Sequence, residues 1–444
     1  MKQNLKQSPV VQAGPAKSYN FKRGFCSMFD FYSNRRDFLR IGSIGAGMSS
    51  LGLSDIAMGQ EEAQQEFKDS SVVWVWLGGG PTQFETFHAP KEDSVPDEYR
   101  SVGGALRDKN TGMAFGSHWQ DLIKQAPKLN VVDSFTHGDS SHRQATHWVM
   151  TSHRNNERSQ TSNSMFPSHG SIVSAVYGAN HPKNGVPTYV RQGKIEGEDP
   201  AWLGGAYKPF DPSNKENLTP RVDIERFANR NELLKSLEGV NIPSPSAGSV
   251  TKFNQQAFDV ILGTAKDAFN LDKEDPKMKE AYGDTPIGKQ LLLARRLCQF
   301  GTRFVTIHYG GWDMHSNIGD ALKGRVPPID KALAAFVEDV HQQGLNEKIL
   351  LIVTGEFGRT KLNATAGRDH WPSISTMLMS GGRYDSGRVI GAADKSYTPK
   401  DSPYGPIDVA ATMFDHFGIP ENIQKVDNGG RPRYLLEGEA KIIL

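Results

Sequence analysis

Runs of apolar residues separated by polar segments give the clearest indication of the fold. Two of these runs, Val72–Leu77 and Lys348–Thr354, are almost continuously apolar and rich in β-branched residues. Such runs are typical of strands buried on both faces of a parallel sheet, because a strand with one wet face would alternate apolar and polar residues. Four shorter runs predict further strands, at 129–132, 188–190, 303–308 and 375–379.

Apolar residues at helical spacing predict helices between these strands. In the segment 329–343, for example, Ile329, Leu333, Phe336 and Val340 recur every three or four positions. Further helices are predicted at 142–150, 172–177, 253–270, 289–300 and 406–417. The alternation of strands and helices predicts an α/β fold with a mainly parallel central sheet, helices on both faces and loop insertions.

The first 70 residues differ from the rest of the chain. Ser33–Leu39 reads SNRRDFL, a twin-arginine export signature, and the Gly/Ser-rich stretch 41–58 after it is too short and too weakly apolar to span a membrane stably. We therefore expect a twin-arginine signal region at 1–59, a polar linker at 60–70, and one domain at 71–444 with an insertion at about 191–250. The protein would meet the twin-arginine export machinery and be periplasmic or otherwise exported. An ordinary amphipathic helix is the alternative for the signature.

The net charge bears on which partners the chain could bind, and the cysteine content bears on whether it could form a disulfide. The chain has 444 residues, with 51 basic and 50 acidic side chains and a formal net charge of +1. This balance gives no reason to expect binding to nucleic acid or to an anionic membrane surface. The two cysteines are Cys26 and Cys298. Because Cys26 falls in the signal region, the mature protein would carry one thiol and no internal disulfide.

Acidic and histidine side chains follow three of the predicted strands. These candidate metal ligands are Glu85 after the first strand, Asp313 and His315 after the strand at 303–308, and Glu356, Asp369 and His370 after the strand at 348–354. Because the carboxyl ends of parallel strands share one edge of a sheet, the side chains could reach a common cleft. Carboxylates mixed with imidazoles suit a divalent metal, zinc before manganese or iron, with calcium as a further alternative. The set could fill one metal site completely or contribute to two.

Each candidate also has an ordinary structural role as its alternative. These roles are a helix cap for Asp313, a surface position for His315, an ion pair with Arg359 for Glu356, a capped turn for Asp369 and His370, and a cap or an ion pair with Lys91 for Glu85. Taken together they would require every cluster to fall at the same sheet edge by chance. The sequence therefore favours a metal site.

Five motifs occur in an order that resembles a known family. They are GGGPTQFETFHAPK, HRQATHWVMTSH, GGWDMHSN, VTGEFGRTKLN and GRDHWP. Together, over about 72–419, they resemble the exported bacterial family called domain of unknown function 1501, which is similar to the alkaline phosphatase and sulfatase superfamily. The resemblance implies an alkaline-phosphatase-like α/β fold and, by analogy with the superfamily, hydrolysis of phosphate or sulfate esters.

The superfamily pattern also implies roles for single residues. The ligand after the first strand corresponds to Glu85, where the family usually has Asp, and the superfamily's Asp–His–Gly corresponds to Glu356, Phe357 and Gly358. Phe357 cannot bind metal, so one of two metal sites would be lost or altered. The Asp–His pair of one site resembles Asp313 and His315, and the late His resembles His370.

The superfamily's nucleophile opens a helix, and here that position falls at Ser140, Ser141 and His142. Ser141 is the candidate nucleophile, with helix capping as its alternative. Arg143 or Arg359 would hold the equatorial oxygens of the ester, and His142 would protonate the leaving group or bind metal. No Cys–x–Pro–x–Arg motif is present, which argues against a formylglycine sulfatase.

The substrate would be a small-molecule or polysaccharide ester. Trp312 and Trp371 lie near the motifs and could stack on a sugar, although packing in the core is the more frequent role of an aromatic side chain. The alternative to an enzyme is a catalytically silent metal-binding or structural envelope protein with the same fold. A peptidase or amidase ranks last, because the helical two-histidine zinc signature is missing.

Overall fold

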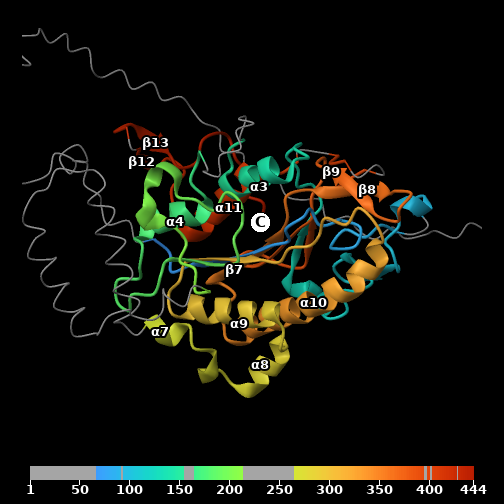
Figure 1. Ribbon diagram of the computed structural model, residues 1–444, viewed down its shortest axis with the longest axis horizontal. Coiled ribbons are helices and arrows are strands. Elements are labelled where there is room, and N and C mark those ends of the chain that lie inside the picture. Colours follow the sequence, from blue (N-terminus) through green and yellow to red (C-terminus); the bar gives the residue numbers. More distant parts are fainter. Residues whose placement is uncertain are drawn as a thin grey trace, which may run out of the picture. The chain divides into compact units, whose positions relative to one another are not determined.

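The computed structural model describes residues 67–91, 94–154, 165–213, 265–394, 398–400, 403–427 and 429–444 (Figure 1). Lys68–Leu444 forms one compact unit. The expected signal region, most of the expected linker and much of the expected insertion lie outside the described residues. Among those that are described, no helix combines the length and the apolarity needed to cross a bilayer.

A seven-stranded sheet forms the centre of this unit, in the order β11-β4-β10-β7-β1-β6-β5. The strands are β1 (Ser71–Trp76), β4 (Asn130–Val132), β5 (Tyr189–Gln192), β6 (Phe304–His308), β7 (Ile349–Thr354), β10 (Met377–Gly381) and β11 (Arg388–Ile390). Only β10 runs against its two neighbours, β4 and β7, and the other pairs in the sheet are parallel. The predicted mainly parallel sheet is confirmed.

The central strand β1 explains why its sequence is apolar without interruption. It lies between β6 and β7, with Trp74 opposite Thr306 on one side and Ile352 on the other. All six residues of β1 are buried. Helices cover both faces of the sheet, so side chains pointing either way leave water.

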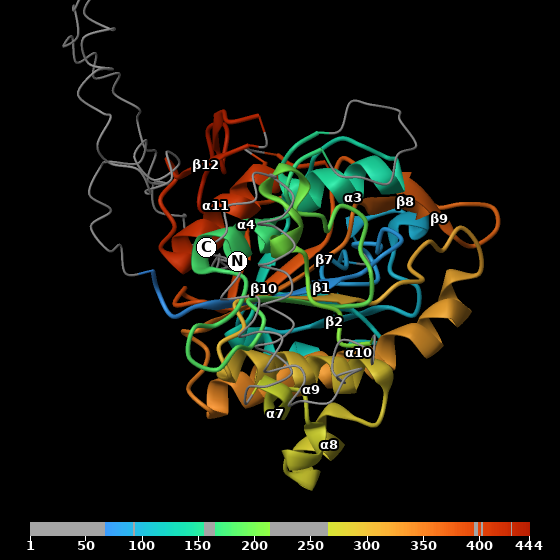
Figure 2. The same ribbon diagram turned by 60° about the vertical axis from the view of Figure 1, so that its left-hand side comes forward.

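Helices lie on both sides of the sheet (Figures 1 and 2). One layer holds α3 (His142–Thr151), α4 (His169–Tyr177) and α11 (Pro406–Phe417); the other holds α7 (Ala265–Ala268), α8 (Pro276–Tyr282), α9 (Pro286–Gln299) and α10 (Ile318–Gln342). Short 3-10 helices connect them, at η2 (Asp97–Tyr99), η3 (Leu122–Lys128), η4 (Ala201–Leu203), η5 (Gly205–Tyr207) and η7 (Leu271–Lys273).

Helix α10 begins eleven positions before the predicted start at Ile329 and runs through Pro327 and Pro328. Prolines inside a helix remove backbone hydrogen bonds, which is why the sequence favoured a start after them. Burial of the apolar side chains of Ile318, Leu322 and Val326 offsets that loss.

Three two-stranded sheets lie outside the central one. They are β2 (Ala105–Arg107) with β3 (Ala114–Gly116), β8 (Gly358–Leu362) with β9 (Arg368–Trp371), and β12 (Gln424–Val426) with β13 (Pro432–Tyr434). No strand was predicted within the hairpin β8–β9. Its residues are largely polar or charged, so the apolar pattern that reveals a buried strand is missing.

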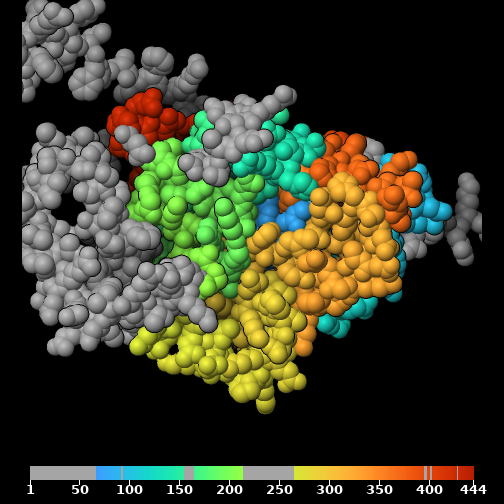
Figure 3. All heavy atoms as spheres, viewed as in Figure 1, coloured from blue at the N-terminus to red at the C-terminus, as the bar shows by residue number. Residues whose placement is uncertain are grey.

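Strand direction brings distant segments to one edge of the sheet. The carboxyl ends of β1, β4, β6 and β7 meet there because these strands run the same way. The antiparallel β10 places its amino end at that edge, so residues 355–376 leave the sheet and return to it at the same place. In the space-filling view the blue N-terminal segment of the unit is visible between teal, green and orange segments (Figure 3).

Candidate metal centre

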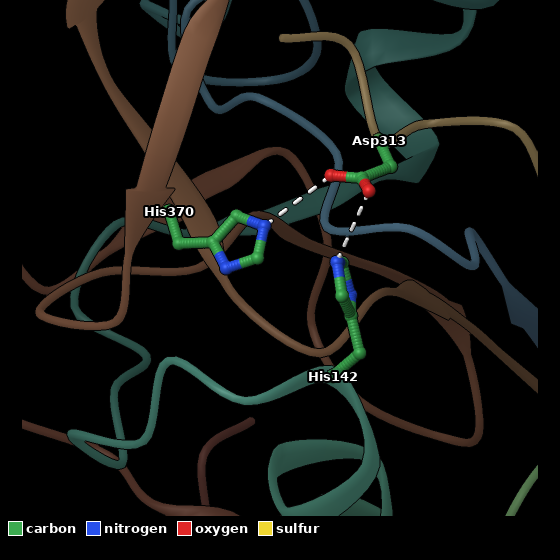
Figure 4. A group of neighbouring side chains, drawn as sticks. All are labelled: His142, Asp313 and His370. Atoms are coloured by element: carbon green, nitrogen blue, oxygen red, sulfur yellow. Dashed lines mark hydrogen bonds and ion pairs between the residues drawn. The ribbon is translucent and has the colours of Figure 1, made fainter.

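Three side chains from separate elements converge at this edge (Figure 4). His142 begins α3, Asp313 follows β6, and His370 lies in β9. One potential ligand atom from each lies within 4.8 Å of the others. The two carboxylate oxygens are divided between the rings, since His142 Nε2 lies 3.4 Å from Oδ2 and His370 Nε2 lies 3.3 Å from Oδ1.

His315 adds a third imidazole to this group. Its Nε2 atom lies 2.9 Å from Asp313 Oδ1 and 3.2 Å from His370 Nε2. In a tetrahedral site with ligands at about 2.0–2.1 Å, neighbouring ligand atoms are about 3.3 Å apart. The separations between Asp313, His315 and His370 are close to that value. We call His142, Asp313, His315 and His370 the His–Asp cluster.

All three rings are held through Nδ1 by an oxygen atom. The Nδ1 contacts are His142 to Glu356 Oε1 at 2.7 Å, His315 to Asp369 Oδ1 at 2.9 Å, and His370 to the Ser140 carbonyl at 2.8 Å. A proton on each Nδ1 would satisfy these oxygens and leave a lone pair on Nε2. In that tautomer all three Nε2 atoms turn a lone pair toward the Asp313 carboxylate, the arrangement usual for metal-binding histidines and their supporting residues.

Glu356 supports the cluster without facing it directly. Its carboxylate is buried, and Oε1 also accepts a hydrogen bond of 2.8 Å from the backbone N–H of Gly79. The hydrogen bond to Glu356 raises the pKa of His142, although burial of the ring opposes this. His142 Nε2 and Glu356 Oε2 are among the buried polar atoms of the described residues for which no hydrogen-bond partner is found. A cation at the cluster would give His142 Nε2 a partner.

Arg359 fixes the carboxylate of the cluster. Its Nη2 donates to Asp313 Oδ1 at 2.5 Å, and burial, which would raise the pKa of Asp313, is outweighed by the hydrogen bond and charge of Arg359, which bring it to about 2. The other N–H groups are directed at the carbonyls of Gly79, Gly80 and Arg368 and at His315 Nε2. All five N–H groups thus have partners among the described residues, and Arg359 holds Asp313 in position.

Glu85 lies outside the cluster. Its Oε1 forms an ion pair of 2.7 Å with Arg368, and both side chains are almost completely buried. Thr82 Oγ1 and the Val102 N–H also donate to this carboxylate, at 2.6 and 3.1 Å. These contacts anchor β9 to the loop after β1, and the structure does not bring Glu85 together with the other candidate ligands. A buried carboxylate needs a cationic partner, and Arg368 in the GRDHWP motif was the signal that could have revealed it.

The expected nucleophile and anion-binding arginine lie at the start of α3. Ser141 is exposed and is the N-cap residue, but its side chain makes no capping hydrogen bond. Arg143 forms a half-exposed ion pair with Glu196. Neither side chain contacts the His–Asp cluster through an interaction among the described residues.

Phe357 and Gly367 pack against the histidines of the cluster. The ring of Phe357 lies 4.8 Å from that of His142 and 4.5 Å from that of His370, between centroids. It therefore supports the imidazoles where the superfamily pattern has a ligand. A side chain on Gly367 would overlap the His315 backbone, so glycine is needed for β9 to approach it. Trp312 is buried, and its indole N–H bonds the Tyr309 carbonyl, so it is a packing residue.

A family model described as "Protein of unknown function (DUF1501)" matches residues 69–444. The chain belongs to this family. The membership expected from the motifs is confirmed, and no curated protein matches the chain.

Solved structures resemble the chain more distantly. The lipoteichoic acid synthase LtaP from Listeria monocytogenes is 10% identical with a TM-score of 0.38, over 80% of this chain and 73% of that one. The PsFucS1 sulfatase from Pseudoalteromonas sp. is 13% identical with a TM-score of 0.37, over 82% and 70%. The phosphonate monoester hydrolase SpPMH from Silicibacter pomeroyi is 10% identical with a TM-score of 0.35, over 80% and 74%. Likeness of this degree carries no information about the reaction.

Proposed function

We propose that the protein is an exported metal-dependent hydrolase of phosphate or sulfate esters. The observation that carries this proposal is the common arrangement of three histidines, each held through Nδ1 and each directing Nε2 at Asp313. Three imidazoles around one carboxylate are a ligand set for a divalent cation. Ordinary surface histidines have no reason to share this orientation.

The ligand chemistry supports zinc first, and manganese or iron after it. Imidazole suits these metals, whereas calcium prefers six to eight oxygen ligands. A bound divalent cation supplies Lewis-acid chemistry, drawing negative charge from an ester oxygen. The His–Asp cluster would hold it, and Glu85 would not take part because its carboxylate is already paired with Arg368.

The surrounding residues would keep the cluster ready to bind. Glu356 and Asp369 accept the Nδ1 protons of His142 and His315, and Arg359 keeps Asp313 ionised. Ser141 is the nucleophile of this proposal, since it precedes His142 and its hydroxyl is free of the capping bond. Arg143 would bind the anionic ester, because its ion pair with Glu196 is partly exposed and costs little to exchange.

The test combines metal analysis with turnover. Purified mature protein should contain a divalent metal by mass spectrometry and hydrolyse an aryl phosphate or an aryl sulfate. The His370→Ala variant should lose both, whereas His181→Ala should keep both, because His181 lies outside the cluster. Wild-type protein without bound metal, or full turnover in His370→Ala, would contradict the proposal.

One observation favours a second candidate, a metal-binding protein without catalysis. The N–H groups of Arg359 are all occupied, and no described basic side chain contacts the hydroxyl of Ser141. A nucleophilic serine ordinarily needs an adjacent base or a metal. Bound metal lost in His370→Ala, with no turnover of either ester by the wild type, would favour this candidate.

We further propose export by the twin-arginine route to the periplasm, supported by the motif at Ser33–Leu39. Replacing Arg35 and Arg36 together by lysine should retain the protein in the cytoplasm, as measured by cell fractionation. Unchanged export of that variant would contradict this route.

A further inference from the structure

A cavity of about 350 Å³ lies beside the His–Asp cluster. Its lining comes from hairpin β8–β9, from η2 and from the loop after β1. The volume falls within the range of small-molecule sites.

Two side chains belong both to the cavity wall and to the surroundings of the cluster. Arg359 lines the cavity and donates to Asp313, and Asp369 lines the cavity and accepts from His315. The cavity and the cluster therefore share these two side chains as neighbours. The cavity is therefore placed to hold a part of the substrate that does not react.

Aromatic rings form much of the wall. Phe84 is buried at the base, and the Arg368 guanidinium lies 4.2 Å from its ring centroid. Tyr99 and Trp371 are half-buried and pack against the small core formed by Phe84 and Ile374. Rings of this kind offer a flat apolar surface with little conformational freedom to lose on binding.

The polar groups of the wall set a second requirement. Asp369 Oδ1 accepts hydrogen bonds from His315 and Asn363, whereas Oδ2 is not engaged by any described residue. The Asp369 side chain is 58% exposed. A purely apolar occupant would cover this carboxylate without supplying a hydrogen-bond donor, which is costly. Arg359 and Lys361 also line the cavity, so its wall carries charges of both signs. An uncharged molecule with hydroxyl groups can donate to Asp369 without bringing a net charge of its own.

We propose that this cavity binds a neutral pyranose ring of a glycan that carries the ester. The apolar C–H face of the ring would pack on Tyr99 and Trp371, and its hydroxyls would donate to Asp369. This inference rests on the proposed hydrolase function and specifies its substrate class. It places the ester at the cluster and the adjoining sugar against hairpin β8–β9.

The test measures binding of sugars that carry no ester, so it needs neither metal nor turnover. The probes are the methyl glycosides of glucose, galactose, mannose and fucose, with benzyl alcohol and cyclohexanol as apolar comparators, observed by saturation-transfer difference NMR on the mature protein. We expect at least one glycoside to bind with a Kd in roughly the millimolar range. Trp371→Ala should weaken binding at least about tenfold, and Trp371→Tyr, which keeps a ring, should restore most of it.

Further variants distinguish the loss of an aromatic contact with the sugar from a general loss of folding. Tyr99→Leu should weaken binding while keeping apolar contact with Phe84, and Trp202→Ala, outside the cavity in η4, should leave it unchanged. His370→Ala should lose metal but still bind the glycoside, so the subsite and the proposed hydrolase can fail independently. The inference is overturned if no glycoside binds, if only the apolar comparators bind, or if binding survives both Trp371→Ala and Tyr99→Leu.

Discussion

Arg359 donates a hydrogen bond of 2.5 Å to Asp313, although the arginine side chain is only 1% exposed and the aspartate side chain is 46% exposed. The buried partner is tied to the loop after β1 through the carbonyls of Gly79 and Gly80. A charge fixed from within the protein thus orients a carboxylate that faces the surface. A substitution of Arg359 should therefore affect both the fold around the loop after β1 and the position of Asp313.

Replacing Arg359 by lysine should loosen the site, because an ammonium group cannot reproduce the planar fork of donors. We expect a loss of about 2–4 kcal/mol in the free energy of unfolding, mainly from backbone carbonyls left without donors. Urea denaturation of metal-free protein measures this. Arg143→Lys is the matched control and should change stability by less than about 1 kcal/mol, because its ion pair is partly exposed. Equal effects of the two substitutions would refute the positioning role.

Glu356→Gln should weaken metal binding while leaving the fold intact. The amide cannot accept the Nδ1 proton of His142 as strongly, so the lone pair on Nε2 becomes less basic and less well oriented. Loss of such a supporting carboxylate typically costs about 10–100-fold in metal affinity. Competition with a chromogenic chelator measures the change, and Asp320→Asn on the exposed face of α10 is the control. An unchanged affinity would show that Glu356 serves the fold alone.

Substitutions that break the ion pair between Glu85 and Arg368 should destabilise the protein while leaving the His–Asp cluster able to bind metal. We expect Glu85→Gln and Arg368→Met each to cost about 3–5 kcal/mol, because each leaves a buried partner unpaired. The double variant Glu85→Gln/Arg368→Met should cost less than the sum of the single changes. Folded Glu85→Gln should keep its metal. Metal loss without loss of stability would instead make Glu85 a ligand.

Glu198 should make stability depend on pH. Burial raises its pKa to about 7, against the hydrogen bonds from Thr306, Ile195 and Tyr189. A carboxyl with a raised folded-state pKa adds stability that is fully present below its unfolded value near 4.5 and is lost as pH rises through about 7. The loss should reach roughly 3 kcal/mol between those limits. Denaturation curves of the wild type and Glu198→Gln across this range should diverge, and parallel curves would contradict the assignment.

The central sheet could be predicted from sequence because burial on both faces leaves an unambiguous pattern. The runs at Val72–Leu77 and Lys348–Thr354 correspond to β1 and β7, and the edge that they predict is where Asp313 and His315 lie. Helix α11 matches its predicted range of 406–417 completely. Local pattern and tertiary position agree in these elements.

The surroundings of the cluster could not be predicted in the same way. Whether Glu85 meets a metal or Arg368 depends on how the loop after β1 packs on hairpin β8–β9, and both alternatives involve a carboxylate after a strand. The partners of Arg359 are mostly backbone carbonyls, which have no signature in the sequence. The orientation of each histidine likewise depends on the oxygen atom that its Nδ1 contacts. For His370 that atom is the backbone carbonyl of Ser140, which a residue of any type could supply.

The reversal of β10 has a consequence for how this family can vary. Residues 355–376 form an excursion anchored at both ends by neighbouring strands, and the turn at its tip, 363–367, is hydrogen-bonded to the backbone of His315, Asn317 and Ile318. A change in the length of this turn would therefore move His315 together with the wall of the neighbouring cavity. The arms that carry Glu356 and His370 would stay in register with the sheet.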